Sequence, residues 1–189
     1  MEKVSTTAPC PALSKPEYLA RTANRFRQSK RPKDPTSIES ELEDDALPEN
    51  FLRADVETNT SRHLIFATDE QLETLGRAST WYIDGTFKLV KHPFKQLLTM
   101  NAFIRQDDCV KQVPLIFVLM SSRRKKDYKK VIRKVLELLN MVSVKKVVMD
   151  FERALWAAVK TRLPHVEVMG CVFHWTQAVW RKVSNENPS

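Results

Sequence analysis

The chain has 189 residues, of which 42% are hydrophobic, enough for one globular domain with a core and flanking segments. The formal net charge of +8 favours polyanionic partners, because a cationic surface attracts phosphate groups. No apolar run approaches the roughly 20 residues that span a bilayer, and the N-terminus lacks a secretory signal pattern, so we expect an intracellular protein without membrane segments.

Residues 1–55 are rich in proline and charge, with the basic segment "RFRQSKRPK" followed by the acidic segment "ESELEDD". Such a composition buries little apolar surface, so we predict a flexible arm. One short helix is expected within it, around Pro16 to Arg27, because apolar residues share a face there. The basic segment fits a nuclear address, a phosphate-binding tail or a merely solvated arm.

Residues 56–80 are expected to lead into the domain as a strand and a helix. Leu64 to Phe66 has the pattern of a short strand. Thr68 followed by Gln71 has the form of a capping box, which predicts a helix that runs to about Arg77.

From Trp81 the periodicity predicts a mixed α/β sheet. The expected strands are Trp81–Val90, Phe94–Ile104, Val113–Met120, Val144–Met149 and Val166–Phe173, and the expected helices are Asp127–Val142, Phe151 to about Leu163, and a last one that contains Ala178 and Val183. Short loops join the first three strands and favour an antiparallel meander, whereas helical crossovers join the later strands and favour parallel pairing. On the first strand, Trp81, Ile83, Phe87 and Leu89 should share the apolar face.

Two aspartates in strand-like segments each allow two interpretations. Asp84, in "YIDGTF", is either the turn of an Asp-Gly hairpin or a strand residue that faces a site. Asp150, in "VVMDFERALW", either caps the following helix or lies at the end of a buried strand as a ligand. Carboxylates on neighbouring strands share hard cations, and a pair of such cations activates a nucleophile and stabilises a leaving oxygen in phosphodiester chemistry.

Two further features have functional interpretations. Cys171 and His174 have the spacing of half a zinc site, although no second close pair completes four ligands, and packing is the alternative. The run "SSRRKKDYKK" offers six cations to phosphates or is simply a solvated face: Arg123, Arg124, Lys125, Lys126, Lys129 and Lys130. The three glycines form neither GxGxxG nor GxxxxGK[ST], so we expect no nucleotide cofactor.

Taken in order, several segments resemble the MULE (Mutator-like element) transposase domain, particularly its relatives linked to FLYWCH zinc fingers in animal genomes. These segments are "RHLIFAT", "WYIDGTFKLV", "PFKQLLTMNAFI", "KQVPLIFVLM", "DYKKVIRKVL", "VVMDFERALW" and "GCVFHWTQAVWRKV". The resemblance covers about Arg62 to Val183, so residues 81–183 are expected to form a partial domain of this type, followed by a tail at 184–189.

The resemblance implies a ribonuclease-H-like fold and nuclear cleavage and joining of DNA at transposon ends with Mg²⁺ or Mn²⁺. It matches Asp84 and Asp150 to the first two catalytic residues of a DDE triad, and Cys171 and His174 to a CxxH signature, with homo-oligomers as a further expectation. The family's third acidic residue lies well downstream of CxxH, and neither Glu152 nor Glu186 has its position.

We therefore expect a C-terminally incomplete domain that is inactive alone. The alternative is a domesticated DNA-binding or protein-interaction module that keeps the fold without catalysis.

Overall fold

The computed structural model describes residues 16–29, 35–40, 47–87 and 89–186. The chain divides into two units, Met1–Asp34 and Pro35–Ser189. The first unit contains helix α1 (Pro16–Ser29), which confirms the helix expected there and exposes Tyr18 and Phe26. Cys10, Lys88, the end of the basic segment, most of the acidic segment and the last three residues lie outside the described residues.

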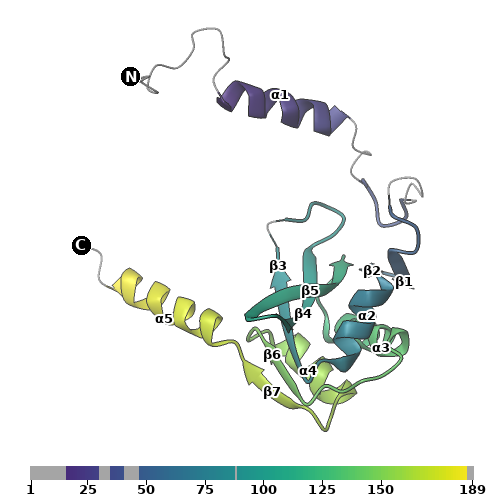
Figure 1. The fold of residues 1–189 in the computed structure, drawn as a ribbon, viewed down its shortest axis with the longest axis vertical. Helices are drawn as coiled ribbons and strands as arrows, with labels where there is room; N and C mark the ends of the chain where they lie inside the picture. Colours follow the sequence, from purple (N-terminus) through teal and green to yellow (C-terminus); the bar gives the residue numbers. More distant parts are fainter. Residues whose placement is uncertain (1–15, 30–34, 41–46, 88, 187–189) are drawn as a thin grey trace, which may run out of the picture. The chain divides into compact units, whose positions relative to one another are not determined.

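The second unit contains a sheet and four helices among its described residues (Figure 1). Its strands are β1 (Leu52–Thr58), β2 (Ser61–Phe66), β3 (Thr80–Thr86), β4 (Gln96–Gln106), β5 (Cys109–Met120), β6 (Lys146–Met149) and β7 (Glu167–Gly170). Its helices are α2 (Asp69–Arg77), α3 (Lys125–Leu138), α4 (Arg153–Arg162) and α5 (Val172–Glu186). None of the described helices is both long and apolar enough to cross a membrane.

The strands form one sheet in the order β1-β2-β5-β4-β3-β6-β7. Pairing is antiparallel from β1 to β3, and β6 and β7 join on the other side of β3 as parallel strands. This confirms the predicted mixed sheet, with its antiparallel meander followed by parallel strands. Strand β1 was not predicted; it lies at the edge of the sheet and pairs with β2 alone among the described strands.

The core lies between the sheet and helices α2, α3 and α4. Trp81 of β3 is fully buried, and its indole N–H donates to the Leu75 carbonyl at 2.9 Å, which ties α2 to the central strand. The capping box at the start of α2 is confirmed, because the backbone N–H of Gln71 donates to Thr68 Oγ1 and the backbone N–H of Thr68 donates to Gln71 Oε1.

Several predicted boundaries were wrong, because the partner strand decides where a ladder ends. Strand β3 stops at Thr86, which pairs with Leu97 near the start of β4, so β3 does not continue to Val90. Phe87 and Leu89 are therefore exposed instead of lying on the apolar face.

The ends of α3 and β7 also differ from the prediction. Helix α3 ends at Leu138, and Leu139 turns into the core outside the helix, whereas Val142 is exposed. Strand β7 ends at Gly170, so Phe173 belongs to α5 and not to a strand.

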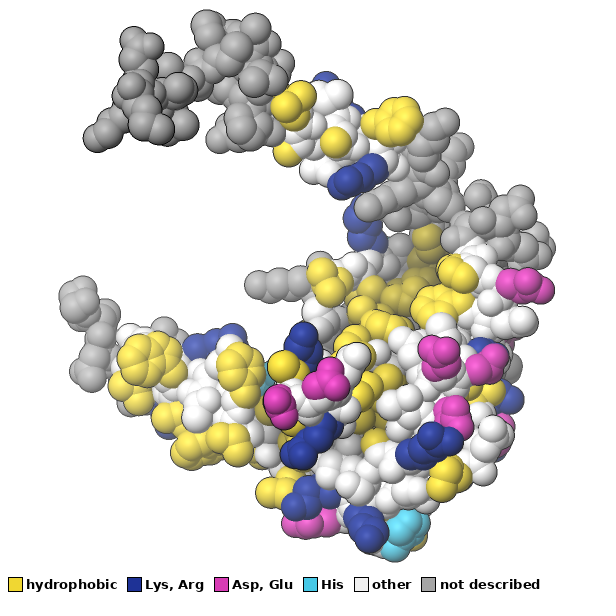
Figure 2. All heavy atoms as spheres, in the orientation of Figure 1, with side chains coloured by type: hydrophobic (Ala, Val, Ile, Leu, Met, Phe, Trp, Pro, Cys, Tyr) yellow, Lys and Arg dark blue, Asp and Glu magenta, His cyan; other side chains and the backbone are white. Residues whose placement is uncertain are grey.

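Helix α5 exposes a broad set of apolar side chains. Figure 2 shows these hydrophobic side chains gathered along the helix. Among them Phe173, Trp175 and Trp180 each expose more than half of their surface.

Candidate functional site

The register of the parallel strands brings Asp84 and Asp150 side by side. Ile83 of β3 is level with Met149, the last residue of β6, so Asp84 lies level with Asp150, which directly follows β6. Asp84 pairs with Thr99 of β4 inside a continuous ladder, which excludes the hairpin-turn interpretation of this residue. Both carboxylates therefore stand at the carboxyl ends of adjacent parallel strands, where ligands bind in α/β sheets.

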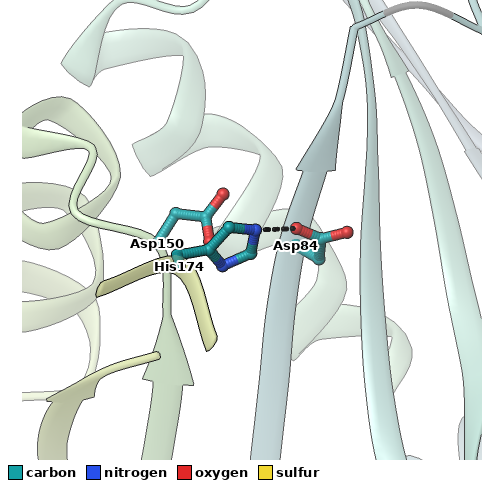
Figure 3. A group of neighbouring side chains, drawn as sticks. All are labelled: Asp84, Asp150 and His174. Atoms are coloured by element: carbon teal, nitrogen blue, oxygen red, sulfur yellow. Dashed lines mark ion pairs between the residues drawn. The ribbon is translucent and has the colours of Figure 1, made fainter. Parts of the chain in front are cut away.

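His174 completes a three-residue cluster with the two aspartates (Figure 3). One ligand atom from each residue lies within 4.8 Å of the others. His174 Nε2 is 3.8 Å from Asp84 Oδ1, and His174 Nδ1 contacts Asp150 Oδ1. The imidazole, near the start of α5, therefore lies between the two carboxylates.

The atoms of this cluster are poorly satisfied by the rest of the protein. Asp150 Oδ1 and His174 Nδ1 are both buried, and neither makes a hydrogen bond of good geometry with any described residue. Burial raises the pKa of Asp150, and the negative charges of Asp84 and Glu152 raise that pKa further, while His174 lowers it. Buried polar atoms that make no hydrogen bond, next to a second carboxylate, fit a cation site.

Asp150 does not cap helix α4, contrary to one of its two predicted roles. The N-cap position is Glu152, and its side chain makes no capping bond. Instead, Glu152 Oε2 accepts a hydrogen bond from the Tyr128 hydroxyl at 2.8 Å. The Asp150 carboxylate turns toward His174, and its backbone carbonyl accepts a hydrogen bond from Trp156 Nε1 at 2.6 Å.

A cavity of about 580 Å³ opens beside the cluster. Its lining includes Tyr82, Thr99, Asn101, Cys171 and Phe173, together with all three residues of the cluster. Cys171 follows β7, and its amide donates to the Met149 carbonyl, which places it level with Asp150. The two residues of the CxxH pattern thus line one cavity, but His174 approaches the aspartates and the Cys171 sulfur is not one of the clustered ligand atoms.

The six predicted nucleic-acid-binding cations lie in the segment that follows β5. Strands β3 and β5 are both antiparallel to β4, so they run in the same direction and end on the same side of the sheet as Asp84 and Asp150. Lys125 and Lys126 are exposed, and Lys129 and Lys130 are half-buried.

The two arginines of this segment are engaged with the protein. The Arg123 guanidinium lies 4.7 Å from the centre of the Phe87 ring. Arg124 donates through Nε to Asp127 Oδ2 and through its NH₂ group to Thr60 Oγ1.

A buried polar cluster surrounds Asp127, which the sequence placed at the start of a helix. The carboxylate is completely buried at the start of α3, where it accepts hydrogen bonds from Ser61 Oγ at 2.9 Å and Ser122 Oγ at 2.7 Å. His63 Nε2 lies 3.6 Å from Asp127 Oδ1 and is also buried. Ser61 and His63 belong to β2, more than 60 residues before Asp127 in the chain, so no local sequence pattern predicts this polar cluster.

The fold and the cluster together define a class: a mixed α/β domain with two carboxylates and an imidazole at the carboxyl ends of adjoining strands, a donor set suited to a divalent cation. The model of one family, the MULE transposase domain, matches residues 80–178, just over half of the chain. The chain belongs to this family. Asp84, Asp150 and His174 all fall inside the matched segment. A search of curated proteins found no match.

Proposed function

We propose that this domain derives from a transposon enzyme that cleaves and joins DNA, with Asp84 and Asp150 as its cation-binding carboxylates. The observation that carries the proposal is their position, abreast on adjacent parallel strands with His174 between them, in a domain of the MULE transposase family. The strand order supports a ribonuclease-H-like assignment, because a three-stranded antiparallel meander is extended from its first strand, β3, by two parallel strands.

A divalent cation such as Mg²⁺ or Mn²⁺ would supply Lewis-acid stabilisation of the phosphodiester oxygens and a deprotonated nucleophile. Asp84 and Asp150 would hold it, because both are carboxylates and their oxygens lie within 4.8 Å of each other and of the His174 imidazole. The imidazole would have to leave its contact with Asp150 or bind the cation itself. An imidazole nitrogen in the donor set favours Mn²⁺ over Mg²⁺ as the ion to test first.

The DNA would lie across the end of the sheet that carries both the carboxylates and the cations of the run "SSRRKKDYKK", which follows β5. Lys125 and Lys126 are exposed there, as are Arg123 and Arg124. We propose transposon ends as the ancestral DNA, the nucleus as the location, and a FLYWCH-associated branch as the part of the family to which the chain belongs, all on the sequence resemblance. Zinc at Cys171 and His174 and self-association stay proposals on the same basis.

Among the described residues, the cluster contains two carboxylates and no third. Glu152 is the nearest further carboxylate in sequence, and it is engaged by the Tyr128 hydroxyl. Two-metal centres distribute their cations over more acidic ligands than this. We therefore propose that this polypeptide binds one cation weakly and does not complete strand transfer alone.

A domesticated DNA-binding module without catalysis is the second candidate. It is favoured by the contact between His174 and Asp150, which occupies a carboxylate oxygen that a catalytic cation would need. In this case the cations of "SSRRKKDYKK" would still bind phosphates, while the cluster would serve to hold α5 on the end of β6.

Mn²⁺ titration of the full chain, followed by electron paramagnetic resonance or calorimetry, separates these two functions. The Asp84→Asn and Asp150→Asn variants should each weaken Mn²⁺ binding by more than about tenfold, since even outer-shell changes cost that much at metal sites. Asp107→Asn, an exposed carboxylate in the β4–β5 turn, is the matched control and should bind as the unaltered chain does. Equal Mn²⁺ affinity in all four proteins would refute the cation site.

A further inference from the structure

A second surface borders the cluster and is built from aromatic and cationic side chains. Phe151 directly follows Asp150 and has 58% of its surface exposed. Its ring is stacked on the Trp156 ring with centroids 6.1 Å apart and planes 15° from parallel. Lys160 Nζ lies 5.5 Å from the Trp156 ring centre. We call this surface the Phe151 platform; its members line one shallow hollow and are Phe151, Arg153, Trp156, Ala157 and Lys160.

The platform is held in place although its rings are accessible. Trp156 Nε1 donates to the Asp150 carbonyl, which anchors the indole to the end of β6. The Phe151 ring lies directly against Gly170 of β7, where an added Cβ would come within 2.3 Å of the ring. A side chain at position 170 would displace the ring, so Gly170 lets Phe151 rest between the β7 backbone and Trp156. An aromatic that is both exposed and immobilised loses little conformational entropy when it binds a ligand.

We propose that the Phe151 platform binds an unpaired base of a DNA strand that lies at the carboxylate cluster. The open area of Phe151 offers a stacking surface to any base, and base–aromatic stacking does not depend on sequence. The described residues that line the hollow include two cations, Arg153 and Lys160, and no carboxylate, so their charge is complementary to the adjoining phosphates.

The occupant is a single strand and not a duplex, because a base stacks on a side chain only after it has left the stack of its own helix. Phe151 and Asp150 are consecutive residues, with about 3.8 Å between their Cα atoms, so a strand that places one base on the platform can also reach the separate cavity that holds the cluster. The inference thus deepens the proposed function: it rests on DNA as the substrate of this site and adds an unpaired nucleotide next to the reacting phosphodiester.

Binding of a fluorescent oligothymidylate of about 12 nucleotides to the full chain, measured by anisotropy in EDTA, tests the platform. Phe151→Leu should weaken binding of the single strand at least about fivefold, because leucine keeps an apolar contact but removes the stacking ring. Its binding to a duplex of the same length should not change. Phe103→Leu is the matched control, since Phe103 is a similarly exposed phenylalanine on β4, and it should leave both affinities unchanged.

Lys160→Gln supplies a second readout. If Lys160 meets a phosphate, the slope of log affinity against log salt concentration should fall by about 0.7 for the single strand. Single-strand affinity that is the same in Phe151→Leu and in the unaltered chain would overturn the platform. So would a Phe151-dependent preference for oligouridylate over oligothymidylate, because the strand would then be RNA.

EDTA keeps this test separate from the cation site. Phe151-dependent binding of the single strand without any Mn²⁺ binding would leave the platform standing and remove the metal proposal. Mn²⁺ binding that depends on Asp84, without any effect of Phe151→Leu on binding of the oligonucleotide, would support the metal proposal and overturn the platform. Circular dichroism and thermal melting of each variant confirm that the folded state is being compared.

Discussion

Asp127 links α3 to β2 and to the segment between β5 and α3. Its replacement by asparagine tests how these parts of the chain are held together. Burial alone would raise the pKa of this carboxyl, but hydrogen bonds from Ser122, Ser61 and Arg124, together with His63, outweigh burial and lower the pKa to about 2. From the ordinary value of 3.8, that shift corresponds to about 2 kcal/mol of folding free energy at neutral pH.

The sign of the pH dependence follows from the direction of the shift. A carboxyl whose pKa is lower in the folded state binds fewer protons there than in the unfolded chain, so its stabilisation is complete above about pH 4 and is lost as the pH falls through about 2. Asp127→Asn removes this acid-sensitive contribution. At pH 7 we expect the free energy of unfolding to fall by about 2 to 4 kcal/mol, because the neutral amide presents an N–H to groups that are themselves donors.

Urea denaturation followed by tryptophan fluorescence at several pH values between 2 and 7 measures both effects, since Trp81 is completely buried. Asp107→Asn is the control, because Asp107 is exposed with a φ of 52°, a conformation that asparagine also adopts. The argument fails if Asp127→Asn is as stable as the control at pH 7, or if its stability still declines below pH 4 as steeply as that of the unaltered chain.

Three further predictions follow from single contacts. Burial lowers the pKa of His63, so the unfolded chain binds a proton below about pH 6.5 that the folded chain excludes. His63→Gln should therefore reduce the loss of unfolding free energy between pH 7 and 5, measured by urea titration. An unchanged dependence of that free energy on pH would contradict this prediction. Gly170→Ala should destabilise the domain by about 1 to 3 kcal/mol through its clash with the Phe151 ring, and Phe151→Ala should relieve that loss in a double-mutant cycle, whereas additive losses would exclude the clash. Thr68→Ala should cost about 1 kcal/mol in thermal melting by removing the capping box of α2, and an unaltered melting temperature would show that the cap contributes nothing.

Short-range patterns predicted the parts of the fold that depend on neighbouring residues. The capping box at Thr68 and Gln71 needs only four consecutive residues, and the short β-branched segment before Asp150 indicates a buried parallel strand. Apolar residues at helical spacing predicted α3, although its last turn was wrong. The sequence also placed Asp84 and Asp150 in strand-like segments, but left open whether each was a turn, a cap or a ligand.

Register and long-range contacts decided the rest. Asp84 and Asp150 are neighbours because Ile83 pairs with Met149, a relation that no local pattern encodes. His174 joins them because α5 begins directly after β7, the strand that adjoins β6.

Apart from β1, the sequence by itself determined the types of element, their order and the residues with metal-binding chemistry, since these depend on composition and periodicity within a few residues. The tertiary structure decided which of those residues share a site. Asp127 shows the difference most clearly, because the sequence placed it only at the start of a helix, whereas its buried carboxylate accepts a hydrogen bond from Ser61, 66 positions earlier in the chain. Hydrogen bonds between such distant residues depend on the strand order, which becomes defined only when the whole sheet has formed.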